Sequence, residues 1–391
     1  MKKYLNLLSS FIIMLCIGSI YAWSIFASEL IKNYSFSASQ SQIIFGTVIL
    51  IFPLTMIIIG LSRLKNHPRF IGYLSGVFFL LGYLLSGYSK GNFYLILVGT
   101  GLLAGIGTGL GYWLSITFPV QCFPKKKGLV TGLVAAGFGL GAVFMSELAE
   151  IILNNGYDAL ELMKFFGLLY GVIILVFSNF IYAVCNIQSK NLENIKPKAL
   201  IQSSGFLKSF LGIFLGTFAG LLIIGSLRMI GSQYNISDHI IVLGIAFFAL
   251  SNFLGRIFWG FISDYLKTNL IIFIDLFIQA IAILSLTLFN LTGPSYLTIV
   301  SLIGFGFGGN FVLFAKETAQ RYGMNKLGQV YPYIFMGYAI AGITGPLSGG
   351  YLFDLSASYT SSIILASMMS FFGGLVFFIN YLSVNKRRIT R

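Results

Sequence analysis

Residues 162 to 207 read LMKFFGLLYGVIILVFSNFIYAVCNIQSKNLENIKPKALIQSSGFL, and this stretch decides how the chain is interpreted. Its first part, to about residue 186, is almost free of charge and long enough for a membrane-spanning helix, which needs about 20 apolar residues. The part from Gln188 to Leu207 is polar and contains lysines, a glutamate and a proline. Another long apolar run follows it. The stretch therefore predicts two membrane spans joined by a polar linker.

Similar apolar runs fill most of the 391 residues. The mean hydropathy is +0.89, and 57% of the residues are hydrophobic while 9% are charged, whereas soluble domains carry about 25% charged residues. Runs long enough to cross a bilayer are expected near residues 6–30, 40–61, 70–88, 93–115, 128–152, 162–186, 207–230, 239–261, 270–289, 295–315, 328–352 and 360–382. The sequence thus predicts an all-α membrane protein with twelve transmembrane helices. Because a soluble catalytic domain has no room in the short loops, we do not expect an enzyme.

The basic residues follow a pattern that predicts the orientation in the membrane. The chain carries 25 Lys and Arg against 11 Asp and Glu, for a net charge of +14. Twenty of the 25 basic residues lie in alternate loops or near the two termini. Since cytoplasmic loops carry the excess of Lys and Arg, both termini are expected in the cytoplasm, in a multi-pass protein of a bacterial inner membrane. The charges are not gathered on one surface, as nucleic-acid binding would require, so no nucleic-acid partner is expected.

The polar linker divides the chain into two halves of similar length. We expect an N-terminal half at residues 1–187, a cytoplasmic linker at 188–206 and a C-terminal half at 207–391, with six spans in each half. Glycines recur between the halves at an offset of 200 residues, as Gly60 with Gly260, Gly128 with Gly328, and Gly137 with Gly337. Two parallel six-span repeats, with substrate bound between them, are the architecture of major facilitator transporters.

Three groups of motifs resemble one family within that superfamily. They are IYAWSIF at residues 20–26; GIGTGLGY at 105–112 with FPKKKGLVTG at 123–132 and AGFGLGA at 136–142; and NFLGRIFWGFISD at 252–264. Together they are similar to the oxalate:formate antiporter group, which includes monocarboxylate carriers. The resemblance extends over nearly the whole chain. It implies a secondary transporter of a small organic anion that works by alternating access.

The resemblance also implies a substrate-binding cation and a departure from the family pattern. An arginine in span eight of the oxalate carrier maps onto Arg256. A lysine in span eleven maps, by an alignment anchored on Pro346, onto Tyr338. Because one of two cations is replaced by a tyrosine, a ligand with one negative charge is favoured.

Arg256 is also the strongest candidate on physical grounds. It precedes Asp264 by eight residues, which places it about 12 Å along a helix from the end of the span. A charged side chain at such a depth costs at least about 2.5 kcal/mol, and the planar guanidinium fork matches a carboxylate. The alternative is a structural ion pair, or an arginine whose side chain reaches the membrane surface.

Other residues are expected to complete the binding site or to gate it. Tyrosine and amide side chains could line a cavity around the anion, and the candidates, beside the alternative of ordinary packing, are Tyr21, Tyr112, Tyr331, Tyr338 and Asn310. The resemblance supports Tyr21 and Tyr112 in particular. Expected gating residues are Asp264, Arg228, Gly128 and Gly137; the two glycines belong to spacings of small residues that let helices approach closely. The superfamily's loop motif is present after span eight as Gly260 and Asp264, whereas no aspartate follows Gly60 after span two.

Asp275 is an acid six residues into the predicted ninth span. It could pair with basic residues of the nearby loop or carry a proton. Its position near the end of the span favours pairing.

The leading functional prediction is a transporter of a monocarboxylate of the formate, lactate or pyruvate type. Two alternatives stay open: a carrier of an amino acid or another small solute, in which Glu29 would meet the ammonium group, and a transporter-like sensor without flux. Uniport, proton symport and exchange with a counter-substrate are equally compatible with the sequence. No phosphate-binding Gly-Lys-Ser/Thr motif is present, and Cys16, Cys122 and Cys185 lack metal-ligand spacing. We therefore expect no cofactor and no metal. We also expect a monomer in the lipid bilayer.

Overall fold

The computed structural model describes residues 2–182, 197–288 and 291–389. Within these ranges the chain is helical and contains no strand. Eleven of the described helices are long and apolar enough to cross a membrane. The remaining long helix is Leu327–Ser356, in which tyrosine, glycine and proline replace part of the aliphatic content. The all-α fold expected from the apolar runs is confirmed.

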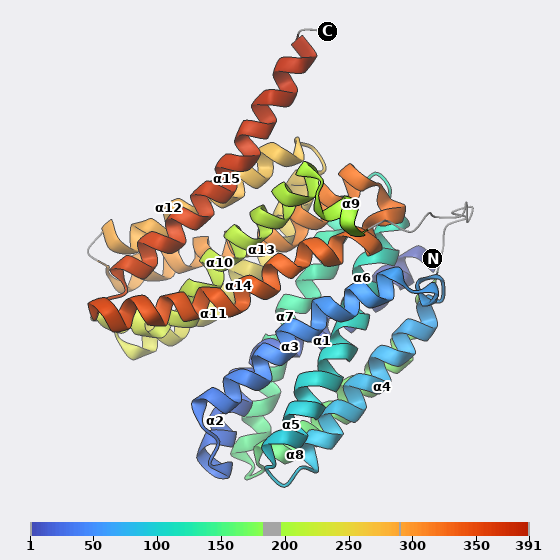
Figure 1. Cartoon of the computed structure of the whole chain (residues 1–391). Helices are drawn as coiled ribbons and strands as arrows, with labels where there is room; N and C mark the ends of the chain where they lie inside the picture. The colour runs from blue at the N-terminus through green and yellow to red at the C-terminus, as the bar shows by residue number, and fades with distance from the viewer. Residues whose placement is uncertain (1, 183–196, 289–290, 390–391) are drawn as a thin grey trace. The chain divides into compact units, whose positions relative to one another are not determined.

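The first eight α-helices precede the linker region and are drawn from blue to green in Figure 1. Their bounds are α1 (Lys2–Gly18), α2 (Trp23–Tyr34), α3 (Ala38–Leu61), α4 (Pro68–Gly87), α5 (Phe93–Ile96), α6 (Gly105–Gln121), α7 (Lys127–Asn154) and α8 (Ala159–Ser178). The short α9 (Pro197–Ile201) follows. Then come α10 (Ser204–Gln233), α11 (Asp238–Ser263), α12 (Thr268–Leu288), α13 (Gly293–Tyr322), α14 (Leu327–Ser356) and α15 (Thr360–Ile389).

Part of the expected linker at 188–206 lies outside the described residues, and Cys185 lies outside them too. From Pro197 onward it forms α9 and the start of α10. The Ser203 hydroxyl accepts a hydrogen bond from the backbone N–H of Phe206 and thereby caps α10. Such N-caps satisfy donors that a helix leaves open at its start.

Two predicted spans are not continuous α-helices. The first is interrupted by a tight turn, η1 (Ser19–Ala22), between α1 and α2. The backbone here lies against α7, since a side chain on Gly18 would place its Cβ 2.0 Å from the Phe138 carbonyl oxygen. The fourth begins with α5 and then widens into a π-helical segment, η3 (Leu97–Ala104), before α6. Such segments are rare and occur often at functional sites.

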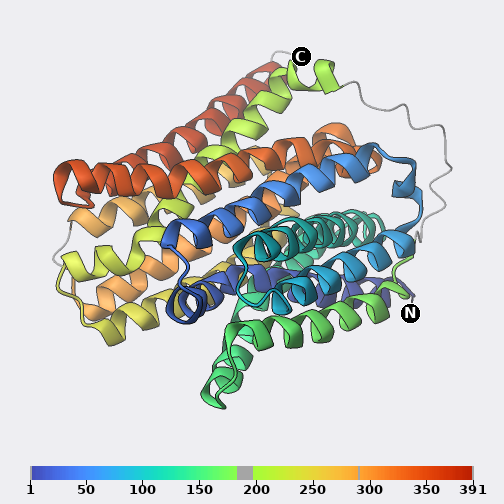
Figure 2. The same cartoon turned by 60° about the horizontal axis from the view of Figure 1, so that its bottom comes forward.

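The contacts divide the chain into two compact units. Unit 1 comprises residues 1–124, 133–194 and 328–332, and unit 2 comprises 125–132, 195–327 and 333–391. In unit 1, α4 packs along α8, and α6 packs along α3 and α1; in unit 2, α11 packs along α13, and α15 along α12 and α10 (Figures 1 and 2). The start of α7, to Gly132, is grouped with unit 2, and residues 328–332 of α14 are grouped with unit 1.

The glycine pairs found in the sequence make equivalent contacts in the two units. In unit 1 an added Cβ on Gly60 would lie 2.3 Å from the Gly328 carbonyl oxygen, and in unit 2 one on Gly128 would lie 2.3 Å from that of Gly260. Both distances are too short for any side chain, so two helix backbones cross directly at each place. Further along, Gly137 lies against α1 and Gly337 against α10. The two units are thus pseudo-symmetric in their packing.

The end of α2 is tied to the start of α8 within unit 1. The Tyr34 hydroxyl donates a hydrogen bond to Asp158, which also accepts bonds of 2.9 Å from the backbone N–H groups of Leu160 and Glu161. Burial raises the pKa of Tyr34 to about 12, and the hydrogen bond to Asp158 acts in the same direction. Burial by itself would raise the pKa of Asp158, but the bonds from Tyr34, Glu161 and Leu160 outweigh it and lower that pKa. At neutral pH this contact therefore joins a neutral phenol to a carboxylate.

Candidate functional site

Arg256 lies on α11 and is completely buried. Its Nε donates a hydrogen bond of 2.9 Å to Oδ1 of Asn252, one helical turn earlier. Its guanidinium carbon lies 4.5 Å from the centre of the Phe311 ring on α13. A cation above an aromatic face is attracted to the ring. These two contacts hold the guanidinium in one orientation at a buried place in unit 2.

Tyr338 meets the same phenylalanine from α14. Its ring centre lies 5.3 Å from that of Phe311, edge to face, and 5.0 Å from that of Phe335, stacked. Only 1% of Tyr338 is exposed. The structure thus brings together two of the predicted substrate residues, Arg256 and Tyr338, around Phe311. We call Arg256, Asn252, Phe311, Phe335 and Tyr338 the arginine cluster.

The arginine cluster has the chemistry of an anion site. A guanidinium carries five N–H donors in one plane, and the bond to Asn252 uses the one on Nε. Two parallel donors of such a fork bind both oxygens of a carboxylate. Sites for small ligands commonly combine apolar and aromatic walls with a few polar groups. Phe311, Phe335 and Tyr338 supply such walls.

Two further predicted residues meet in unit 1. The rings of Tyr21, in η1, and Tyr112, on α6, both contact Phe138 edge to face, with centre distances of 5.2 and 5.4 Å. Tyr112 is buried and also contacts Phe52 at 4.9 Å. Phe138 precedes Tyr338 by 200 residues, so each unit has an aromatic cluster at the equivalent helix. Tyr331 is buried as well and belongs to the segment 328–332 of unit 1.

Asn310 is the predicted substrate residue whose described bonds lead away from the arginine cluster. It lies on α13 one residue before Phe311, and its Nδ2 donates a bond of 3.2 Å to Oε1 of Gln279 on α12. Gln279 in turn donates from Nε2 to the Gly216 carbonyl oxygen on α10, at 3.0 Å. The side chain of Asn310 therefore belongs to a buried polar group between α10, α12 and α13.

Asp264 is the C-cap residue of α11 and binds the start of α7. Its carboxylate accepts bonds of 2.9 and 3.0 Å from the backbone N–H groups of Gly128 and Leu129. A carboxylate at a helix N-terminus is stabilised by the open donors and by the helix dipole. Next to it, the backbones of Gly128 and Gly260 cross. The two predicted gating residues Asp264 and Gly128 thus form one contact in unit 2.

The span expected at residues 295–315 would leave Lys316 in the loop that follows, but the structure buries this lysine in α13. Its Nζ lies 2.7 Å from Oδ1 of Asp264 and also donates to the carbonyl and hydroxyl oxygens of Ser263. Lys316 is 3% exposed. Lys316 directly follows the expected end of the span at residue 315. The one hint in the sequence that it could be buried is Asp264, an acid that could serve as its partner. A buried ion pair therefore completes the contact between α11 and the start of α7.

Unit 1 has a counterpart without an acid. Where Gly60 crosses Gly328, the carbonyl oxygen of Gly328 accepts a bond of 2.5 Å from Nε1 of Trp113. No aspartate follows Gly60, and at this crossing the hydrogen bond comes from the indole N–H of Trp113 on α6. The other predicted gating residues lie apart from both crossings: Gly137 packs on α1, and Arg228 is exposed on α10.

The expected pairing of Asp275 with loop cations is wrong. This side chain is 1% exposed, and it takes part in none of the salt bridges found among the described residues. Its carboxyl group lies against Gly309 of α13, where an added Cβ would be 2.4 Å from Oδ2. The face of α12 that carries Asp275 points toward α13 and not toward the loop.

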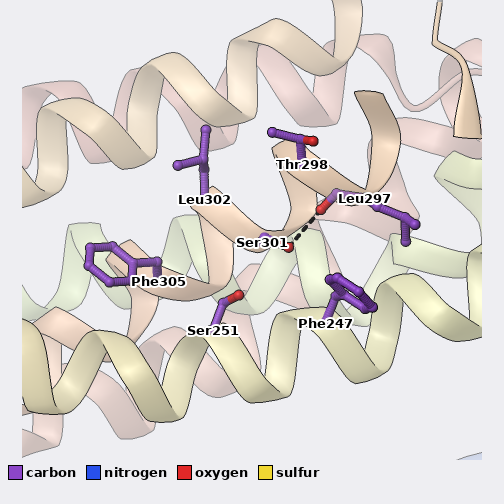
Figure 3. Close-up of a pocket in the computed structure, with 7 residues that line it drawn as sticks. All are labelled: Phe247, Ser251, Leu297, Thr298, Ser301, Leu302 and Phe305. Carbon is purple, nitrogen blue, oxygen red and sulfur yellow. Dashed lines mark hydrogen bonds between the residues drawn. The ribbon is translucent and has the colours of Figure 1, made fainter. Parts of the chain in front are cut away.

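A groove of about 320 Å³ opens between α11 and α13 (Figure 3). It is lined by Phe247 and Ser251 from α11 and by Leu297, Thr298, Ser301, Leu302 and Phe305 from α13. Phe247 and Leu302 are each more than two-fifths exposed. The lining contains no charged side chain, and Arg256 is not part of it. This groove faces outward and offers no cation for an anion.

The sequence matches the Major Facilitator Superfamily over residues 7–346. The chain belongs to this superfamily. It is 24% identical to an oxalate:formate antiporter from Oxalobacter formigenes over 346 residues, which cover 85% of this chain and 81% of that protein. It is 27% identical to human monocarboxylate transporter 14 over 154 residues, which cover 38% of this chain and 29% of that protein. The resemblance to the antiporter and monocarboxylate carrier group is thus confirmed at low identity.

Solved structures agree on the fold of this facilitator. The crystal structure of the E. coli fucose:proton symporter FucP matches it with a TM-score of 0.75 at 12% identity, over 96% of this chain and 98% of that chain. At this identity the likeness shows the fold alone. As a member of the Major Facilitator Superfamily, the protein is a multi-pass membrane transporter and not an enzyme.

Proposed function

We propose that this facilitator carries a small monocarboxylate across the membrane by alternating access, and that the arginine cluster binds the carboxylate. The observation that carries the proposal is the burial of Arg256, whose guanidinium is fixed by Asn252 and Phe311. A cation at such a place is expensive and is usually functional. The oxalate and formate named for the antiporter are both carboxylates, which fits a guanidinium site.

The test is uptake of labelled formate, lactate and pyruvate into liposomes that contain the purified protein. Uptake of at least one of them above protein-free liposomes is expected. A labelled amino acid carried in preference to all three would replace the proposal with an amino-acid carrier. Specific binding of an acid without uptake would indicate a sensor.

The single cation of the cluster leads to a prediction about charge selectivity. Hydrogen bonds to charged groups contribute about 1.5–3 kcal/mol, and those between neutral groups about 0.5–1.5 kcal/mol. The second carboxylate of oxalate would meet the neutral Tyr338 instead of a second cation. Oxalate should therefore compete for the site more weakly than a monocarboxylate of similar size. Replacing Tyr338→Lys should improve competition by oxalate relative to pyruvate by about 5- to 30-fold, since each 1.4 kcal/mol is a factor of ten.

The matched control is Tyr351→Lys, which adds a lysine at a tyrosine of the same helix that is 65% exposed. It should leave the ratio of oxalate to pyruvate competition unchanged. Stronger competition by oxalate than by formate, lactate and pyruvate in the unaltered protein would contradict the inference from Tyr338.

We also propose that both termini and the linker between the six-helix halves are cytoplasmic, in a bacterial inner membrane. The proposal is supported by the basic residues in alternate loops. A cysteine introduced at Asn191, which lies outside the described residues, should react with a membrane-impermeant maleimide in inside-out vesicles. Labelling of this cysteine only from the outside of intact cells would reverse the orientation.

A further inference from the structure

Two lysines contact the last helix of unit 2 near one end of its span. In this unit α15 packs along α10 and α12 (Figure 1). The Nζ of Lys208, in the second turn of α10, donates a hydrogen bond of 3.2 Å to Oδ1 of Asn380 on α15. The Nζ of Lys267, the residue before α12, lies 5.3 Å from the ring centre of Tyr381. Two cations thus contact consecutive residues of one helix, and we call these four residues the paired-lysine site.

Unit 1 contains an equivalent contact between a cation and a tyrosine. The guanidinium carbon of Arg69, near the start of α4, lies 4.5 Å from the ring centre of Tyr182, which follows α8. Arg69 precedes Lys267 by 198 residues, and Tyr182 precedes Tyr381 by 199 residues. These offsets are close to the 200 residues that separate the paired glycines. The cation over a tyrosine therefore belongs to the repeated architecture of the two units.

The two units differ next to this contact. In unit 1 the amide oxygen of Asn179 accepts a bond of 2.6 Å from the neutral hydroxyl of Tyr73. In unit 2 the amide oxygen of Asn380 accepts its bond from the ammonium of Lys208. Among the described contacts at these helix ends, unit 2 therefore has a second cation where unit 1 has a tyrosine.

The charge around the paired-lysine site is positive. Between their bounds α10 and α15 contain no acidic residue, and the one acid of α12, Asp275, is buried. Asp264, in the segment before α12, is bonded to Lys316. Glu317, on the neighbouring α13, is bonded to Arg321. The sequence of α15 adds three basic residues further on, which are Lys386, Arg387 and Arg388. This helix end therefore attracts anions.

Exposed apolar side chains lie beside the lysines on the same helices. On α10 these are Leu207 and Leu211, and on α15 they are Ile379 and Leu382. Tyrosines are enriched at the boundary between the apolar and polar layers of a membrane, so Tyr381 marks this boundary on α15. A cationic group at the boundary and an apolar surface next to it match the two parts of a phospholipid.

We propose that the paired-lysine site binds the phosphate of one anionic phospholipid, whose acyl chains lie along the exposed apolar surface of α10 and α15. An ammonium has three donors, and the bond to Asn380 uses one of those of Lys208. Ammonium and phosphate form charge-assisted hydrogen bonds, and basic pockets between transmembrane helices bind the headgroups of anionic lipids. A choline headgroup would bring its own positive charge close to two lysines. The site therefore favours a headgroup without a cation, such as that of phosphatidylglycerol.

The experiment is native mass spectrometry of the purified, delipidated protein titrated with phosphatidylglycerol or with phosphatidylcholine of the same acyl chains. Lys208→Gln/Lys267→Gln should weaken binding of the first phosphatidylglycerol by about 30-fold, which corresponds to about 1 kcal/mol for each lysine. Lys208→Arg/Lys267→Arg should bind like the unaltered protein, since arginine also binds phosphate. The matched control is Lys125→Gln/Lys126→Gln, which removes the same charge from two exposed lysines before α7 and should leave this binding unchanged.

The unaltered protein supplies a measurement that does not depend on any variant. It should bind its first phosphatidylglycerol more tightly than its first phosphatidylcholine, and inorganic phosphate should not displace the lipid. Equal affinity for the two lipids, an equal loss in both Lys→Gln double variants, or displacement by inorganic phosphate would overturn the proposal. Since no solute is present, the result is independent of the proposed transport of a monocarboxylate, and failure of either proposal leaves the other standing.

Discussion

Arg256→Gln should abolish high-affinity binding of the transported acid. The substitution removes a buried cation that contacts Phe311 and Asn252. Removing one partner of a buried charge pair costs about 2–5 kcal/mol, which corresponds to a loss of affinity between about 30-fold and several thousand-fold. Arg256→Lys should also fail, although it keeps the charge, because an ammonium lacks the planar fork that binds both carboxylate oxygens.

The measurement is equilibrium binding of labelled pyruvate to purified, folded variants, with formate and lactate as competitors. Arg69→Gln is the matched control, since Arg69 is an exposed arginine at the start of α4 that stacks on Tyr182. It should bind like the unaltered protein. An arginine with a purely structural role would lower the thermal stability of the Arg256 variants and leave the affinity of the folded fraction unchanged. Wild-type affinity in either Arg256 variant would remove the basis of the anion site.

The helices could be predicted from the sequence because each apolar run has about the length, roughly 20 residues, that crosses the hydrocarbon core of a bilayer. The interruptions could not. The turn at Ser19–Ala22 lies where Gly18 approaches the Phe138 carbonyl oxygen, and this contact joins residues that are 120 positions apart. Propensity along one segment carries no information about such a contact.

The candidate site shows the same division between local and tertiary information. Arg256 was found because a lone cation within an apolar run is conspicuous. Its partner Phe311 could not be predicted, because no feature of the sequence distinguishes it from the other phenylalanines among the 39 in the chain. The expected spans leave Lys316 in a loop and place Asp275 within reach of loop cations, because each residue lies near the end of a span. Which face of a helix such a residue occupies depends on the neighbouring helices, and those are known only from the fold.

Asp264→Ala should be one of the most destabilising single substitutions in this chain. It removes the acceptor for the N–H groups of Gly128 and Leu129 and leaves Lys316 as a buried cation without its counter-charge. Breaking a buried ion pair by removing one partner costs about 3–5 kcal/mol, and the loss of a helix cap adds about 1 kcal/mol. The measurement is the thermal midpoint of the purified protein in detergent, followed by intrinsic fluorescence.

A double-mutant cycle separates the ion pair from the cap. Lys316→Met alone leaves Asp264 bonded to the start of α7, so it should cost less than Asp264→Ala. The double variant Asp264→Ala/Lys316→Met should be more stable than the sum of the single effects predicts, because no buried charge is then left alone, and coupling energies of contacting residues reach about 0.5–3 kcal/mol. The Lys164–Glu161 pair is the control, since its side chains are 23% and 49% exposed and surface pairs contribute about 0–1 kcal/mol. Strictly additive effects of the Asp264 and Lys316 substitutions would mean that the lysine is stabilised by Ser263 and not by the carboxylate, and that the contact at the start of α7 depends on hydrogen bonds alone.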